Sequence, residues 1–227
     1  SMFMLKFSTF ADWGTSIYYS NQVNLFNGWR SYSYKGVIGE GWGMSTVNTK
    51  LWDDWSDKDL RKRGSVINVK DPSEIAIHGV DNYGYGTDPH DKQMDDTGLW
   101  QMKYMPINLC RDAQWSNYSV FLYGATRNFQ LDNMQDIVLI RFADILLMHS
   151  ELTQTVDGIN QVRERAGLPS IDSYSLQALQ NERRHELAFE GLRYHDILRW
   201  AGQSNLEQVK TIIDSQGGVS IINNGVP

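Results

Sequence analysis

The chain has little of three things, and each shortage excludes a class of protein. It has a single cysteine in 227 residues, Cys110, which excludes an internal disulfide and a cysteine-based metal cluster. It has no apolar run of about 18 residues, the length that a membrane-spanning helix needs. Its 21 Lys and Arg are scattered and are outnumbered by 27 Asp and Glu, whereas nucleic-acid binding needs a concentrated basic face. We therefore expect a globular protein with no nucleic-acid partner.

The first half of the chain is rich in aromatic and turn-forming residues. Seven of the eight tryptophans lie before residue 116, among many Gly, Asn, Asp and Tyr, a composition that favours turns and long irregular connections. One helix is expected there, within residues 46–64, with Gly64 as its stop. Its apolar positions are Leu51, Trp52, Trp55 and Leu60.

The chain opens with an alternation that is typical of a strand. Phe3, Leu5 and Phe7 alternate with Met4 and Lys6. Domains rarely start inside a strand, so we expect a fragment that lacks its natural N-terminus.

The second half is dominated by helical patterns. Residues 135–152 are apolar nearly all round, which predicts a helix buried on several sides. Arg141 and Asp144 lie three residues apart within it and share a face, so they can pair.

Four further helices are delimited by caps and stops. Asp157 suits an N-cap and Gly167 a position just past the C-terminus, and another helix is expected from Ser175 to Gly191. Short helices follow over residues 193–202 and 205–218, and the short loops predict antiparallel neighbours.

The helix expected from Ser175 to Gly191 has charged residues on its apolar face. At 100° per residue, Arg183 and Glu190 fall with three leucines in a stripe of about 80°. A buried charge is tolerated only if it is paired and hydrogen-bonded. Glu186 beside the stripe and Arg193 just past Gly191 are the nearby charges. The predicted structural ion network therefore consists of Arg183, Glu186, Glu190, Arg193, Arg141 and Asp144.

No motif supports a catalytic or metal site. The Asp-Thr-Gly triplet occurs once, where an aspartic protease needs two. A zinc-protease helix would need a histidine four residues after His185, where Phe189 stands. We expect no metal and no cofactor, although an irregular Ca²⁺ site at Asp81, Asn82 and Asp88 stays open. A pair of carboxylates for glycoside hydrolysis also stays open, because their separation in space is not visible in a sequence.

Aromatic rings among Gly, Asn and Ser are the best candidates for ligand contacts. Flat apolar rings with polar neighbours suit the C–H face and the hydroxyl rim of a sugar. The alternative is that the rings pack the irregular loops onto the helices. The rings are those of Trp13, Tyr18, Tyr19, Trp29, Tyr32, Tyr34, Tyr83 and Tyr85.

Three segments of the second half carry a resemblance to a known family. "DIVLIRFADILLMHSEL", "INQVRERAGLP" and "NERRHELAFEGLRYHDILRW" resemble, in this order, the C-terminal part of SusD/RagB-like proteins. Upstream, "LWDDWSDKDLRKRGSVI" and "TGLWQMKYMP" are similar to less specific family segments. The resemblance covers nearly the whole chain and is most specific over residues 136–201.

The resemblance implies a fold that is mainly α with long irregular loops and minor β. It corresponds to the C-terminal portion of the SusD-like fold, whose helix pairs are tetratricopeptide-like. We expect a single domain fragment over residues 1–227, with a loop-rich aromatic part at 1–134 and a helical scaffold part at 135–227.

The resemblance also implies a function. Family members are outer-membrane lipoproteins of Bacteroidota that capture oligosaccharides, or in some members peptides, at the cell surface. They pass the ligand to a SusC-like TonB-dependent transporter and are not enzymes. The lipid anchor is expected in an N-terminal segment absent from this chain.

The family resemblance directs attention to the loop after the opening strand. Family members often present ligand-facing aromatics there, and in this chain the loop holds Trp13, Tyr18, Tyr19 and Asn21. The motif helices are scaffold in the family. Two other readings stay open, namely a glycoside hydrolase or esterase built on helices and a helical protein-interaction module.

Overall fold

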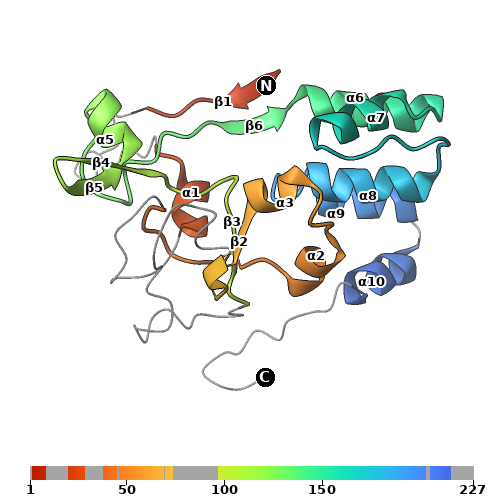
Figure 1. Ribbon diagram of the computed structural model, residues 1–227, viewed down its shortest axis with the longest axis horizontal. Helices are drawn as coiled ribbons and strands as arrows, with labels where there is room; N and C mark the ends of the chain where they lie inside the picture. Colours follow the sequence, from red (N-terminus) through yellow and green to blue (C-terminus); the bar gives the residue numbers. More distant parts are fainter. Residues whose placement is uncertain are drawn as a thin grey trace. The chain divides into compact units, whose positions relative to one another are not determined.

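The computed structural model describes residues 2–8, 20–28, 38–44, 46–68, 70–73, 97–202 and 205–215. These parts are mainly helical with three two-stranded sheets, which confirms the predicted fold class (Figure 1). The chain forms two compact units. The helical unit takes Ser1–Met4, Asn48–Ser65 and Val138–Gly218, and the loop-rich unit takes Leu5–Val47, Val66–Ile137 and Val219–Pro227. No helix in the described ranges is both long and apolar enough to cross a membrane.

The helical unit is built on three helices that contact one another. They are α6 (Phe142–Thr153), α7 (Asp157–Arg165) and α8 (Leu176–Glu186). Two later helices, α9 (Arg193–Ala201) and α10 (Leu206–Asp214), pack together. Two short helices precede them in the chain, α2 (Thr49–Asp54) and α3 (Leu60–Ser65), and α3 contacts α8.

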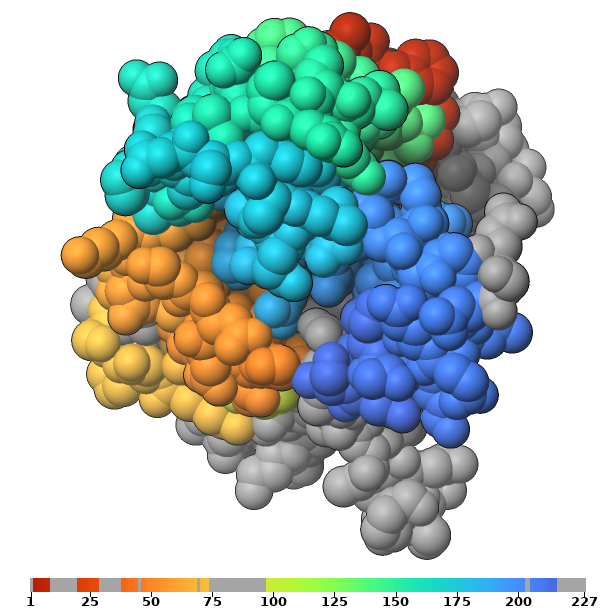
Figure 2. All heavy atoms as spheres, turned by 90° about the vertical axis from the view of Figure 1, so that its right-hand side faces the viewer, coloured from red at the N-terminus to blue at the C-terminus, as the bar shows by residue number. Residues whose placement is uncertain are grey.

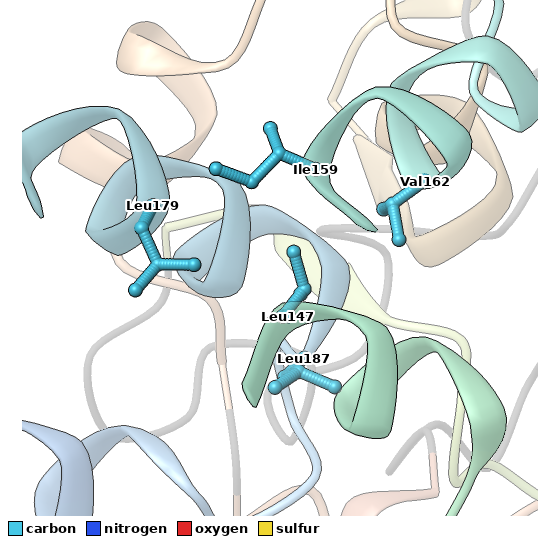
Figure 3. Packing of buried hydrophobic residues seen from close by; sticks show 5 residues of the cluster. All are labelled: Leu147, Ile159, Val162, Leu179 and Leu187. Carbon is cyan, nitrogen blue, oxygen red and sulfur yellow. The ribbon is translucent and has the colours of Figure 1, made fainter. Parts of the chain in front are cut away.

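One apolar cluster holds α6, α7 and α8 together. Figure 3 shows its five buried members, Leu147, Ile159, Val162, Leu179 and Leu187. Each fully buried side chain of this kind contributes about 1.5–3 kcal/mol relative to exposure. Gly158 lets α7 approach α6, because a Cβ there would stand 2.1 Å from the carbonyl oxygen of Leu146.

Of the two predicted boundaries of α7, the C-terminal one is confirmed and the N-terminal one is wrong. Gly167 follows this helix with φ +74°, the left-handed conformation expected of a residue just past a C-terminus. The prediction for Asp157 is wrong, since Val156 occupies the N-cap and Asp157 lies in the first turn. A carboxylate in the first turn still interacts favourably with the helix dipole.

The predicted helix from Ser175 to Gly191 is shorter than expected. Ser175 is the N-cap of α8, and its side chain accepts a hydrogen bond from the Ala178 N–H at 3.1 Å. The helix ends at Glu186, after which Leu187 enters the apolar cluster and Phe189 takes φ +68°. The stop therefore comes from tertiary packing before Gly191 is reached.

The helix predicted over residues 135–152 is wrong in its first part. Ile137–Ile140 is a strand, β6, which pairs with the opening strand β1 (Phe3–Leu5), and α6 begins only at Phe142. The N–H of Met2 donates to the Ile140 carbonyl at 2.9 Å. A run with two isoleucines and a valine has high β propensity, and pairing with β1, which is far away in sequence, makes this run a strand and not a helix.

The single helix predicted within residues 46–64 is two helices, α2 and α3. Trp55 lies between them with extended backbone, φ −88° and ψ 120°, and its indole N–H donates to the Asp59 carboxylate at 2.9 Å. Leu60 is 70% exposed, so it is not a core position. Gly64 lies inside the last turn of α3 rather than after it.

The described residues of the loop-rich unit include two antiparallel strand pairs and two short helices. β2 (Val66–Asn68) pairs with β3 (Leu99–Gln101), and β4 (Asn108–Arg111) pairs with β5 (Gln114–Asn117). The helices are α1 (Gln22–Asn27) and α5 (Tyr118–Tyr123). Asp112 and Ala113 join β4 to β5 with φ +52° and +61°, as a two-residue hairpin turn requires.

Candidate functional site

The candidate ligand site divides into a described and an undescribed part. Trp13, Tyr18 and Tyr19 lie outside the described residues, as does the open Ca²⁺ candidate at Asp81, Asn82 and Asp88. Asn21 is described and belongs to the loop-rich unit. The structure therefore describes only the part of this candidate site that begins at residue 20, directly after the segment of residues 9–19.

Asn21 is the N-cap of α1 and is fully buried. Its Oδ1 accepts hydrogen bonds from the N–H groups of Val23 and Asn24, at 2.9 and 3.3 Å. Its Nδ2 donates to the Gln135 carbonyl at 2.6 Å. Both polar ends of this side chain are thus engaged within the protein, so Asn21 fixes the start of α1.

A second set of hydrogen bonds joins the same point of the chain to Asn133. The Asn21 N–H donates to the Asn133 carbonyl at 2.6 Å. The Ser20 hydroxyl donates to that carbonyl at 3.2 Å and accepts from the Asn133 N–H at 3.1 Å. Ser20 and Asn133 are both buried. Satisfied polar groups in a buried setting hold one geometry, so the backbone directly after residue 19 is fixed.

The network continues through further amide side chains. Asn24 donates from Nδ2 to Gln135 Oε1 at 2.7 Å, and Gln135 donates from Nε2 to the Lys103 carbonyl at 2.6 Å. On the other side, Asn117 donates from Nδ2 to Asn133 Oδ1 at 3.1 Å. We call Ser20, Asn21, Asn24, Asn117, Asn133 and Gln135 the amide cluster. It joins residues 20–24 to residues 117–135 and forms the base of the candidate site.

The loop-rich unit also holds a buried carboxyl group with an unusual pKa. Asp132 is 4% exposed. Burial raises its pKa to about 7, and the nearby Glu40 carboxylate adds to the rise. Burial raises the pKa of Glu40 as well. Enzymes use carboxyl groups that hold a proton near neutral pH. Here the raised pKa follows from burial, and Asp132 has no cationic partner among the residues that the structure describes.

In the helical unit, Glu186 lies at the centre of the predicted ion network. It accepts hydrogen bonds from three guanidinium groups, those of Arg61, Arg141 and Arg165. Burial alone would raise the pKa of Glu186, but hydrogen bonds and charge from the arginines outweigh it and lower the pKa. Arg141 also binds Glu190, with Nε at 2.7 Å and a terminal nitrogen at 2.9 Å.

Arg61 extends this network to residues that the sequence did not reveal. It donates to Asp59 from Nε at 2.9 Å and to Glu182 at 2.6 Å, and Arg163 also donates to Glu182, at 3.1 Å. Asp59 and Glu182 are buried. Arg61 and Glu182 are far apart in sequence, so no helical spacing could have linked them.

Three members of the predicted network differ from the prediction. Arg141 and Asp144 do not pair with each other. Asp144 accepts a hydrogen bond from Arg183 at 2.8 Å. Arg141 forms ion pairs with Glu186 and Glu190. The prediction for Arg193 is wrong. Within the described part of the chain it forms no ion pair and its guanidinium lies 6.0 Å from the centroid of the Trp200 ring. The partial burial predicted for Arg183 and Glu190 is confirmed.

The comparisons with known proteins agree on one family. The SusD family model matches residues 12–224. SusD-like protein P2 of Formosa agariphila is 26% identical over 181 residues, covering 71% of this chain and 32% of the relative.

Solved structures show the same likeness. A laminarin binding SusD-like protein matches with a TM-score of 0.68 and 25% identity, over 97% of this chain and 44% of that one. Surface glycan-binding protein A from Bacteroides thetaiotaomicron, in complex with laminarihexaose, matches with a TM-score of 0.68 and 19% identity, over 97% of this chain and 51% of that one. The chain thus spans about a third to a half of the length of these relatives.

Proposed function

The chain belongs to the SusD family, and on this premise we propose that the protein binds an oligosaccharide at the cell surface. The observation that carries the proposal is the family match over residues 12–224. A neighbour at 25% identity is named for binding laminarin, which supports a glycan as the ligand class. A peptide is the second ligand class, because some members of the family bind peptides.

The proposal includes a role in import without catalysis. The protein delivers its ligand to a SusC-like TonB-dependent transporter and is held at the outer membrane by a lipid anchor. The buried carboxylates of the helical unit support a non-catalytic role, since Asp59, Glu182 and Glu186 are each paired with arginine. A carboxylate fully occupied by guanidinium groups is a poor general base.

The ligand contacts are proposed at Trp13, Tyr18 and Tyr19. Support comes from the base of this segment, where the amide cluster fixes Ser20 and Asn21. Fixing the chain next to a binding residue lowers the entropy that is lost on binding a ligand. Asn21 acts here by positioning its neighbours, because its own side chain already caps α1.

Calorimetry with laminarihexaose tests the proposal, followed by an array of other glycans if that probe does not bind. Trp13→Ala and Tyr19→Ala should each weaken binding by about threefold to tenfold, since a stacked aromatic contact contributes about 0.5–1.5 kcal/mol beyond the area it buries. The matched control is Trp115→Ala, which removes a tryptophan that is 38% exposed on β5 of the same unit and should leave affinity unchanged.

Two outcomes would contradict the proposal. Unchanged binding in both variants would remove Trp13 and Tyr19 from the site. Steady turnover of a chromogenic glycoside, abolished by Asp132→Asn, would make the protein an enzyme instead.

A further inference from the structure

A cleft of about 590 Å³ lies in the helical unit between α8, α9 and α10. Its wall carries the amide side chains of Gln180, Asn181 and Gln208, the guanidinium groups of Arg184 and Arg193, and the ring of Trp200. Figure 2 shows the surface where α8, in cyan, meets α9 and α10, in blue. Amides and cations beside an indole ring are groups that bind polar ligands with an apolar face. This cleft shares no residue with the candidate site of the loop-rich unit.

Arg193 is the unusual group in the cleft. It is half-buried, and among the described residues it has no carboxylate partner. Burial, and then the charge of the neighbouring Arg184, hold its pKa below the ordinary value for arginine. A guanidinium group remains charged in proteins, so the cleft keeps a positive charge that the Trp200 ring and the more distant charge of Asp196 offset only in part.

The carboxylates nearest to Arg193 in the network are already engaged with other cations. Asp196 accepts from Arg183 and Arg199, and Glu151 accepts from Arg199 and from the Trp200 indole N–H at 2.9 Å. On the other side of the cleft, Arg184 pairs with Asp54 at 3.0 Å. Arg193 is therefore available to an acidic group of a ligand.

We propose that this cleft binds an acidic saccharide, whose carboxylate or sulfate group pairs with Arg193. The planar guanidinium group donates two parallel hydrogen bonds to such a group. Gln180, Asn181 and Gln208 donate to and accept from sugar hydroxyls, and Trp200 offers apolar surface to the C–H face of the ring. The ligand class differs from the neutral glucan of the neighbour named for laminarin.

The test compares two trisaccharides by calorimetry at low salt, trigalacturonate and the neutral maltotriose. Trigalacturonate should bind and maltotriose should bind at least about tenfold more weakly, since a charged hydrogen bond contributes well above a neutral one. Arg193→Gln should lower the affinity for trigalacturonate by about tenfold or more. Arg193→Lys should retain part of it, because the charge remains but the parallel hydrogen bonds are lost.

The controls separate this site from the candidate glycan site. Arg127→Gln removes an exposed arginine of the loop-rich unit and should leave trigalacturonate binding unchanged. Trp13→Ala should also leave it unchanged, and Arg193→Gln should leave laminarihexaose binding unchanged. Failure of laminarihexaose to bind would therefore count against the proposed function and not against the cleft.

Equal affinity for the two trisaccharides, or full affinity in a folded Arg193→Gln variant, would overturn the inference. If Arg193→Gln does not fold, Gln208→Glu gives the decisive result. Gln208 is exposed on α10, and the substitution keeps its shape while placing a negative charge at the cleft. It should weaken trigalacturonate binding by about tenfold through repulsion, and unchanged affinity would overturn the inference.

Discussion

Arg183 binds the carboxylate of Asp196 through two hydrogen bonds, from Nε to Oδ2 at 2.8 Å and from a terminal nitrogen to Oδ1 at 3.1 Å. Its other terminal nitrogen donates to Asp144 Oδ1 at 2.8 Å. All three side chains are buried. Because they come from α6, α8 and α9, one guanidinium group links three helices.

Arg183→Ala should therefore lower the free energy of unfolding by about 3–5 kcal/mol, since it leaves the buried Asp144 without Arg183 and the buried Asp196 with Arg199 as its remaining cation. Urea denaturation with the linear extrapolation measures this directly. Arg127→Ala, which removes an exposed arginine, is the matched control and should change stability by less than about 0.5 kcal/mol. A melting temperature of Arg183→Ala within a degree or two of the wild type would show that the buried interaction contributes little.

The sequence predicted the helical scaffold better than the partners of its charges. The burial of Arg183 followed from helical periodicity alone, because an apolar stripe must face a core. Its bond to Asp196 did not follow, since that contact depends on how α9 packs against α8. Arg141 and Asp144 show the same limit, because their spacing allows a pair that tertiary contacts replace with other partners.

Strand pairing and the amide cluster show where sequence reasoning ended. The sequence predicts a helix over Ile137–Ile140, where the structure has a strand, because a continuous apolar run has no periodicity that distinguishes a buried helix from a buried strand. The family resemblance places Asn21 among the ligand contacts. Its role as the N-cap follows only once the start of α1 is known from the structure. The signal was present, since asparagine is a favoured N-cap residue.

Asn21→Ala should lower the free energy of unfolding by about 2 kcal/mol or more. The substitution removes the cap of α1 and leaves the Gln135 carbonyl, bound at 2.6 Å, without its donor in a half-buried setting. The matched control is Asn205→Ala at the exposed N-cap of α10, where only a cap is lost and about 1 kcal/mol is expected. Equal losses in the two variants, by urea denaturation, would show that the hydrogen bond to Gln135 adds nothing.

His185 should make the protein sensitive to acid. It stacks on Trp55 at 5.0 Å between ring centroids, and its buried Nε2 has no hydrogen-bond partner among the described residues. Burial, with the charges of Arg184 and Arg61, lowers its pKa to about 4. The unfolded chain takes up a proton near pH 6.5 and the folded protein does not, so stability falls as the pH drops from about 6.5 to about 4.

His185→Phe keeps the stacked ring and removes the titration. Relative to the variant, the wild type should lose on the order of 3 kcal/mol between pH 6.5 and pH 4, and the difference between the two should be flat above pH 6.5. Denaturation midpoints at half-unit pH intervals measure the difference. Parallel curves across the whole range would show that this imidazole is protonated as readily in the folded protein as in the unfolded chain.

Asp132 should produce the opposite dependence on pH. Burial raises its pKa to about 7 from the model-peptide value near 3.9. Between these values the folded protein keeps a proton that the unfolded chain releases, so stability falls as the pH rises from about 4 to about 7. Asp132→Asn removes this titration. At pH 7 and above, the variant should be more stable than the wild type by an amount on the order of 4 kcal/mol, and this difference should vanish near pH 4.

The matched control is Asp136→Asn, which breaks a surface pair with Lys6 and should lower the free energy of unfolding by less than about 1 kcal/mol. A constant difference between Asp132→Asn and the wild type from pH 4 to pH 8 would mean that Asp132 ionises in the folded protein as it does in water, and burial would then not control its charge.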